Sequence, residues 1–133
     1  MAMRETLTIK TSRRCQMVDI TGQVQDVAKR SGAEEGLCHV YSVHTTAAIT
    51  INEGHDPAVV DDILAHLEKL VPHNGGFRHM EGNSDAHIKV SLVGPGQIIP
   101  VEKGRLLLGT WQRIFFCEFD GPRTRKAIVT VSK

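Results

Sequence analysis

The sequence predicts an α+β domain with a mostly antiparallel, β-sandwich-like core and two helices. Three observations predict this fold class. Short apolar runs with alternating or β-branched residues recur along the chain, separated by turns that contain Gly or Pro. Only two segments carry the apolar spacing of an amphipathic helix. The chain has 133 residues, of which 41% are hydrophobic and 23% charged, so we expect one domain spanning residues 1–133.

The first half of the chain predicts four strands and both helices. Strands are expected at 3–10, 15–20, 37–43 and 47–53. The first helix is expected to end at Gly32 and has an apolar face formed by Ile20, Val24, Val27 and Ala28. The second helix follows Asp56 and Pro57, a capping residue and a first-turn proline. Its apolar stripe comprises Val59, Val60, Ile63, Leu64, Leu67, Leu70 and Val71.

The second half opens with a polar loop and then returns to strands. The loop covers 72–85 and shows no periodicity, and loops of this length inside a domain are typically functional or mobile. Strands are expected at 87–93, 97–101, 106–119 and 125–132. Strong turn signals, GPG and DGP, separate them.

Composition excludes several classes of protein. The formal net charge is +1 and the basic residues form no long run, so neither nucleic-acid nor membrane binding is expected. No apolar run approaches the ~20 residues that span a bilayer, and residues 1–20 lack the apolar segment of a signal peptide. Cys15, Cys38 and Cys117 are odd in number and form no CxxC pair, as expected of reduced thiols. These features predict a cytoplasmic protein.

Three of the seven histidines stand out by their position. His44 ends a predicted strand, His79 lies in the polar segment FRHMEGNSDAH at 77–87, and His87 opens the next predicted strand. Three imidazoles at the ends of elements suit an open metal site. Neutral imidazole is also the natural acid–base group near pH 7. The spacing alone does not separate either role from three unrelated, solvated loop histidines.

Other polar groups are candidates for binding or proton transfer. Arg123 and Arg125 lie two residues apart on an extended chain, where both guanidinium groups can meet one anion; a charged sheet edge is the alternative. Glu53 ends a strand and is a general base, a metal ligand or simply the residue at which the strand meets water. Gln112 is expected to face a pocket on the side of its strand opposite Trp111.

Three stretches together resemble the UPF0047 family, also called YjbQ-like proteins. They are HTTAAITINE (44–53), HMEGNSDAHIKVSLVGPG (79–96) and PVEKGRLLLGTWQRIFFCEFDGPR (100–123). The resemblance implies an α+β homotrimer with a β-sandwich-like core and a polar pocket near the subunit boundary. On this chain the pocket residues would be His44, Thr45, Glu53, His79, Asn83, His87, Gln112, Asp120 and Arg123, with Arg125 as an addition.

The resemblance also implies an activity. Some family members are described as having a secondary thiamine-phosphate synthase activity, which joins a pyrimidine diphosphate to a thiazole phosphate. The expected roles are catalysis by Glu53, His79, His87 and Asn83, and substrate binding by Thr45, Gln112, Asp120, Arg123 and Arg125. A divalent metal, Zn²⁺ or Mg²⁺, would be held by His44, His79 and His87, a set that suits Zn²⁺ better.

Three kinds of function therefore remain open from the sequence. The first is an enzyme acting on a small phosphorylated or anionic metabolite, with metal assistance as an option. The second is a non-catalytic trimeric module that binds a small ligand or a metal with the same residues. The third is an assembly protein whose polar residues only form a hydrogen-bonded seam between subunits.

Overall fold

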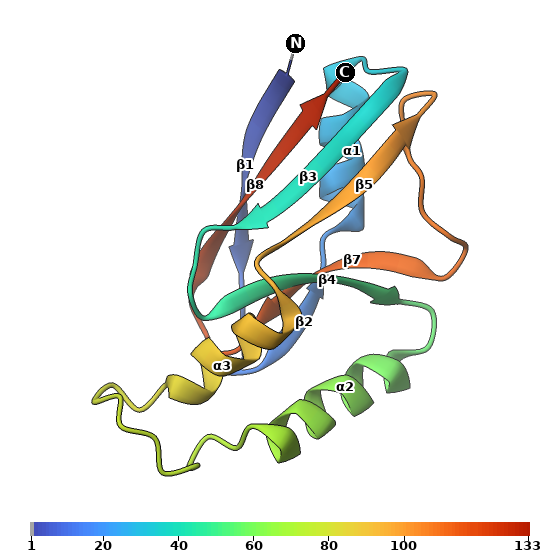
Figure 1. Cartoon of the computed structure of the whole chain (residues 1–133). Helices are drawn as coiled ribbons and strands as arrows, with labels where there is room; N and C mark the ends of the chain where they lie inside the picture. Colours follow the sequence, from blue (N-terminus) through green and yellow to red (C-terminus); the bar gives the residue numbers. More distant parts are fainter. Residues whose placement is uncertain (1) are drawn as a thin grey trace.

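The computed structural model describes residues 2–133. Eight strands and three helices follow one another along the chain (Figure 1). Their order is β1 (Ala2–Lys10), β2 (Gln16–Asp19), α1 (Thr21–Ser31), β3 (Glu35–Ser42), β4 (Ala47–Glu53), α2 (Pro57–Leu70), α3 (Ser84–Val93), β5 (Gly96–Glu102), β6 (Arg105–Leu106), β7 (Gln112–Glu118) and β8 (Thr124–Ser132). None of these helices is long and apolar enough to cross a membrane.

The strands form two antiparallel sheets, which confirms the predicted α+β class. The five-stranded sheet has the order β1-β8-β3-β5-β6, and the three-stranded sheet has the order β2-β7-β4. Every strand pairing is antiparallel. Alternation along β8 buries Arg125, Ala127, Val129 and Val131 on one face and leaves the intervening residues less covered.

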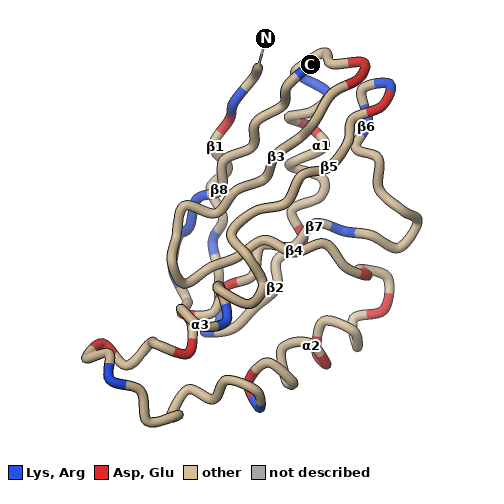
Figure 2. The backbone as a smooth tube through the Cα atoms, viewed as in Figure 1, with Lys and Arg blue, Asp and Glu red and all other residues tan. Residues whose placement is uncertain are grey.

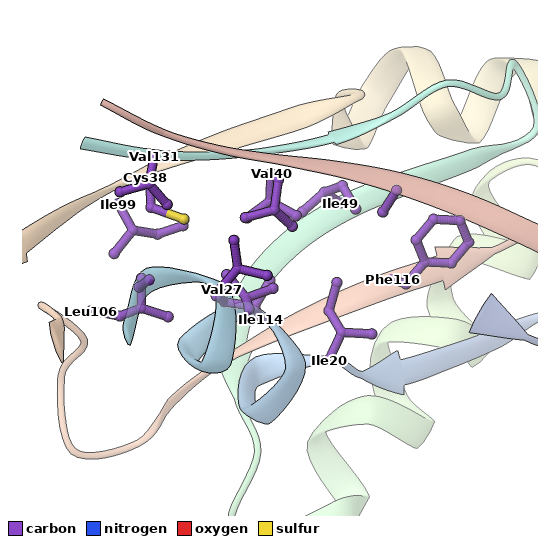
Figure 3. Close-up of a cluster of buried hydrophobic side chains, with 14 of the residues drawn as sticks. Ile20, Val27, Cys38, Val40, Ile49, Ile99, Leu106, Ile114, Phe116 and Val131 are labelled. Atoms are coloured by element: carbon purple, nitrogen blue, oxygen red, sulfur yellow. The ribbon is translucent and has the colours of Figure 1, made fainter. Parts of the chain in front are cut away.

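The main core lies between the two sheets and α1. Val24, Val27 and Ala28 of α1 are fully buried, as the sequence predicts. They pack against apolar residues of both sheets, seen in Figure 3 as one continuous cluster that includes Cys38, Val40, Ile49, Ile99, Ile114, Phe116 and Val131. Gly32 ends the helix at φ +68°, a conformation that favours glycine. Burial of this cluster is the main source of the fold's stability.

The second helix begins as predicted but is only half-buried. Asp56 accepts a hydrogen bond from the Ala58 N–H at 2.9 Å, and Pro57 occupies the first turn. None of its residues is fully buried, and Leu70 is 61% exposed, so the predicted buried stripe is wrong in its extent. The part of the stripe that packs against a second apolar cluster consists of Val60, Ile63, Leu64 and Leu67, and Val71, just after the helix, is buried as predicted.

The third helix replaces a predicted strand. Residues 87–93 alternate like a strand, but they belong to α3. Two pairs at helical i,i+4 spacing explain the difference. Ala86 and Val90 pack in the second apolar cluster, and Asp85 and Lys89 approach each other within 3.7 Å while both are buried. These contacts with distant residues outweigh the local β preference of the segment.

Candidate functional site

A polar cavity of about 440 Å³ brings together residues from three separate parts of the chain. The β3–β4 turn, the loop and first turns of α3, and the start of β8 each contribute side chains to it. Its lining residues are Val43, His44, Thr45, Thr46, His79, Glu81, Asn83, His87, Arg123 and Arg125. Seven of the residues singled out from the sequence therefore meet here, including both ends of the segment at 79–87.

Two of the expected site residues lie elsewhere on the chain. Glu53 and Gln112 are paired neighbours at the far end of β4 and β7. Glu53 accepts a hydrogen bond from the Asp56 N–H at 3.3 Å, and Gln112 accepts one from the Gly109 N–H at 2.7 Å. Because a strand rises ~3.3 Å per residue, Glu53 lies about 20 Å along β4 from the turn that lines the cavity. Within one chain, neither residue takes part in the expected pocket.

Arg123 is held at the cavity by a neighbouring carboxylate. Its Nε donates to the Asp120 backbone carbonyl at 2.8 Å, and its Nη2 donates to Asp120 Oδ2 at 2.7 Å. None of the hydrogen bonds among residues 2–133 uses its Nη1. The side chain is half-exposed, so one face of the guanidinium fork remains available to a ligand.

Arg125 is held in the same way, but it is buried. Its Nε donates to Glu118 Oε1 at 2.8 Å, and its Nη2 contacts Glu118 Oε2 and donates to Thr46 Oγ1 at 2.9 Å. The hydrogen bonds within residues 2–133 again leave Nη1 unused. The two arginines line one cavity, as expected, but each is already paired with a carboxylate rather than free.

Glu118 is the buried anchor of this arrangement, and sequence reasoning missed it. The residue is fully buried and also accepts a hydrogen bond from Thr11 Oγ1 at 2.8 Å. Burial alone raises the pKa of Glu118, but hydrogen bonds from Arg125, the Asp120 N–H and Thr11 outweigh it and hold the pKa below its usual value. A lone glutamate inside the apolar run FFCEF was the available signal, since such a charge requires a partner.

Asn83 and Asp120 connect the cavity to α3. Asn83 Nδ2 donates to Asp120 Oδ2 at 2.8 Å, and Asp120 Oδ1 lies 3.8 Å from Arg14. Arg14 in turn makes a bidentate pair with Asp85, at 2.9 and 3.1 Å. Asp120 therefore stands behind the cavity and orients Asn83 and Arg123, although it does not line the cavity itself.

Buried charges continue this network beneath α3. Lys89 is only 1% exposed and donates to Glu68 Oε2 of α2 at 2.7 Å. Asp85 lies between Lys89 and Arg14 and is fully buried. Burial alone raises the pKa of Asp85, yet the hydrogen bonds and charge of Arg14, together with Lys89, bring it below the usual value. The network fixes the first turn of α3, which presents Asn83 and His87 to the cavity.

His44 has a defined tautomer. Its Nε2 lies 2.9 Å from the backbone N–H of Lys126, and because a backbone N–H can only donate, Nε2 is the acceptor. The proton of the neutral ring is therefore on Nδ1. Burial, followed by the charge of Arg125, lowers the pKa of His44. His44 is thus a neutral hydrogen-bond donor at the edge of the cavity.

This tautomer is directly measurable. In long-range ¹H–¹⁵N spectra we expect the His44 proton on Nδ1, and we expect the ring to remain neutral until the pH falls below its usual pKa of 6.5. The reason is that protonating Nε2 breaks the bond from the Lys126 N–H and adds a charge beside Arg125. An Nε2-protonated neutral ring, or a midpoint above 6.5, would contradict the assignment.

The predicted three-histidine metal site is not formed. His44 Nε2 is taken by a backbone donor and Nδ1 carries the proton, so the ring has no free lone pair. His79 and His87 lie edge to face with their ring centroids 5.4 Å apart, and Glu81 is 3.9 Å from His79 Nε2. Among residues 2–133 no group of three His, Cys, Asp or Glu side chains is arranged to hold a metal ion. The residues of one chain therefore do not fit the expected Zn²⁺ or Mg²⁺.

The remaining pair, His79 and His87, is suited to proton transfer. His79 belongs to the loop before α3 and is exposed, whereas His87 lies one turn into the helix and is partly buried. Their rings face the same cavity as the free Nη1 groups of the two arginines. The arrangement combines fixed donors for an anion with two adjacent imidazoles, which can donate and accept protons.

Comparison with known proteins gives a consistent result. The family model described as "UPF0047 protein YjbQ-like" matches residues 5–133. The "UPF0047 protein YugU" of Bacillus subtilis is 50% identical over 128 residues, covering 96% of this chain and 97% of that protein. A UPF0047 protein of Methanocaldococcus jannaschii is 52% identical over 123 residues, covering 92% and 89%.

Solved structures agree closely with the fold. A crystal structure of an uncharacterised YjbQ/UPF0047 protein from Clostridium acetobutylicum has a TM-score of 0.95 at 50% identity and covers 96% of this chain and 99% of that one. A YjbQ-like protein of unknown function from Sulfolobus solfataricus has a TM-score of 0.95 at 34% identity and covers 98% and 96%.

Proposed function

The chain belongs to the UPF0047 (YjbQ-like) family, and from that premise we propose that it is an enzyme acting on a small phosphorylated or otherwise anionic metabolite in the polar cavity. The observation that carries the proposal is the pair of arginines whose Nη1 groups are left for the cavity while their other nitrogens are held by Asp120 and Glu118. Guanidinium groups fixed in advance bind phosphate without reorganising.

The remaining cavity residues supply directed donors and proton carriers. The neutral ring of His44 offers its Nδ1–H as a hydrogen-bond donor, and Thr45 contributes a hydroxyl group to the lining of the cavity. His79 and His87 are the acid–base pair in this proposal, because only imidazole exchanges protons readily near pH 7. Asn83 and Asp120 position these groups. Glu53 and Gln112 have no role in the cavity of the same chain.

The first reaction to assay is the transferase chemistry that the family resemblance implies. In it, the thiazole nitrogen attacks the methylene carbon of the pyrimidine diphosphate, the carbon–oxygen bond breaks, and pyrophosphate leaves with the electron pair. Arg123 and Arg125 would stabilise the charge that develops on the departing oxygens, and a protonated His79 or His87 would donate to them. No step is assigned to a metal.

Two observations favour a second candidate function, that of a non-catalytic module that binds a small ligand. Arg123 and Arg125 are already neutralised by Asp120 and Glu118, and the expected base, Glu53, is distant. Such a site can hold an anion without turning it over. Ligand-induced thermal stabilisation without product formation would identify this function.

Product formation in single-histidine variants tests the proposal. We expect His79→Ala and His87→Ala to lower the turnover of thiamine-phosphate formation, or of another phosphate-ester substrate, by about 100-fold or more. His66→Ala on the exposed side of α2 is the control and is expected to retain full activity. If the two variants fold normally and keep full activity, the acid–base assignment is wrong.

We also propose that the protein assembles as a homotrimer through the outer face of the five-stranded sheet. In Figure 1 α1 lies behind this sheet. The near face exposes Leu37 (52%), Tyr41 (40%) and Ile98 (62%) on the neighbouring strands β3 and β5. The middle of these strands carries no Lys, Arg, Asp or Glu (Figure 2). Large apolar side chains exposed together on neighbouring strands are typical of subunit interfaces.

Light scattering after size exclusion tests the assembly. We expect wild-type protein at three times 14.7 kDa and Ile98→Asp at a lower mass, because a buried unpaired carboxylate opposes association. Leu70→Asp, which changes a similarly exposed leucine on α2, is the control and should keep the wild-type mass. A wild-type monomer would contradict the proposal.

The proposed location is the cytoplasm. Cys15, Cys38 and Cys117 are free, as expected in a reducing compartment. Burial raises the pKa of Cys38 to about 11 and that of Cys117 to about 12, so both thiols remain protonated and unreactive at neutral pH.

A further inference from the structure

The α2–α3 loop (residues 72–82) has few contacts with the rest of the chain. All of its residues are exposed, and in Figure 1 the loop extends beyond the two helices that it joins. Within residues 2–133, nothing in 74–81 forms a hydrogen bond or an ion pair with a residue outside the loop. Neither of the two apolar clusters in this part of the chain includes a loop residue. A segment with so little packing can move at low cost in free energy.

Both ends of the α2–α3 loop are nevertheless fixed. The His73 backbone N–H donates to Glu68 Oε1 at 3.0 Å, and the same carboxylate accepts a hydrogen bond from the buried Lys89. His73 Nε2 donates to the Gly82 carbonyl at 2.9 Å and so joins one end of the loop to the other. Gly76 and Gly82 have φ values of +75° and +73°, which favour glycine. Fixed ends and two glycines allow the segment between them to turn as one unit.

The α2–α3 loop carries a single cationic side chain, Arg78. Unlike Arg123 and Arg125, Arg78 pairs with no carboxylate in the part of the chain that the structure describes, and it is exposed. It lines a cavity of about 600 Å³ that shares His79 and His87 with the polar cavity. A short rotation of the loop would therefore carry the guanidinium group from one side of the two histidines to the other.

The polar cavity has no excess of positive charge to hold an anion. Arg123 and Arg125 are each paired with a carboxylate, and Glu81 adds a further carboxylate to the lining. A bound anion would repel Glu81 and attract Arg78, which lie three residues apart on the same loop. A ligand stabilises the conformation with which it interacts more favourably. The anion therefore favours a rotation of the loop that replaces Glu81 with Arg78 at the cavity.

We propose that residues 74–82 are a lid that closes over the polar cavity when an anion binds, and that Arg78 becomes the third arginine of the site only in the closed form. The proposal rests on the anion site of the proposed function, and it adds a binding residue and a conformational step to that site. Closure also brings His79 onto the anion and excludes water from the cavity.

Calorimetric titration with pyrophosphate tests the role of Arg78. We expect Arg78→Gln to bind pyrophosphate about tenfold or more weakly than the wild-type protein, because the closed form loses its unpaired guanidinium group. Arg105→Gln is the control for the change in net charge. Arg105 is also exposed, has no carboxylate partner within residues 2–133 and lines neither cavity, so this variant should bind like the wild-type protein.

Limited proteolysis with trypsin tests the closure of the lid. Trypsin cuts after Arg78 only while the side chain is free to enter the protease. We expect saturating pyrophosphate to slow this cut in the wild-type protein at least about tenfold. A synthetic peptide of residues 74–83 is the control, and its cleavage should keep the same rate with and without pyrophosphate.

The outcomes separate the lid from the anion site. If the wild-type protein does not bind pyrophosphate, both proposals fail. If Arg123→Gln weakens binding and Arg78→Gln does not, the lid is wrong while the anion site stands. If Arg78→Gln weakens binding but saturating pyrophosphate leaves the cut after Arg78 at its full rate, Arg78 acts from the open loop and the lid is again wrong.

Discussion

Arg125→Met is expected to lower the free energy of unfolding by about 3–5 kcal/mol, because it leaves Glu118 as a fully buried carboxylate without its positive partner. Only Thr11 and the Asp120 N–H would remain as donors to Glu118. The loss is larger than for an exposed ion pair, since both side chains are at most 2% exposed. Urea unfolding followed by circular dichroism measures it.

A double variant separates the contribution of the Arg125–Glu118 ion pair to stability from that of the packing around it. In Arg125→Met/Glu118→Leu no charge is left unpaired, so we expect most of the lost stability to return. The cavity would meanwhile lose one of its two arginines, so anion binding should remain impaired in this stable protein. If the double variant is as unstable as Arg125→Met, the cost arises from lost packing rather than from the buried charge.

Asp85→Asn is expected to lower the free energy of unfolding by about 2–4 kcal/mol. The change removes the charge that lies between Arg14 and the buried Lys89 and leaves Lys89 with Glu68 alone. Because Asp85 fixes the first turn of α3, the substitution should also disturb Asn83 and His87 at the cavity. Glu5→Gln, which breaks an exposed pair with Arg30, is the matched control and should change stability little.

The pH dependence of stability gives a second measure of the same residue. The pKa of Asp85 is below its usual 3.8 in the folded protein, so the stabilisation is fully present above pH 3.8 and is lost as the pH falls through the folded pKa. Between pH 3.8 and the folded pKa, the free energy of unfolding of the wild-type protein should fall by about 1.4 kcal/mol per pH unit more than that of Asp85→Asn. Parallel curves below pH 3.8 would show that Asp85 gains no stabilisation from ionisation.

Most strands and the first two helices were predictable because their signals are local, but the single strand expected at 106–119 is wrong, because the chain leaves the sheet at 107–111 between β6 and β7. Alternation, capping at Asp56 and the glycine at position 32 act within a few residues, and the structure retains all of them. The third helix was not predictable in this way. Its formation depends on Asp85 and Lys89 meeting Arg14 and Glu68, residues that are distant in sequence or on another helix. No pattern within 84–93 reveals those partners.

The residues of the polar cavity also divide into those that the sequence could predict and those that it could not. Residue type and position at the ends of elements identified His44, His79, His87 and Arg123. The same criterion also selected Glu53, which lies at the other end of β4 from this cavity, because the end of a strand does not reveal which end of the sheet a cavity adjoins. It also could not anticipate that a backbone N–H from β8 occupies His44 Nε2, so that this nitrogen is not open to a metal ion in the single chain.

The central claim is that the polar cavity binds an anion through its fixed arginines, and titration calorimetry with pyrophosphate tests it most directly. The variants to compare are Arg123→Gln and Arg113→Gln; Arg113 is a similarly exposed arginine that pairs with Asp19 away from the cavity. We expect Arg123→Gln to weaken pyrophosphate binding at least about tenfold and Arg113→Gln to leave it unchanged. Equal affinities in the two variants, or no binding to the wild-type protein, would contradict the account.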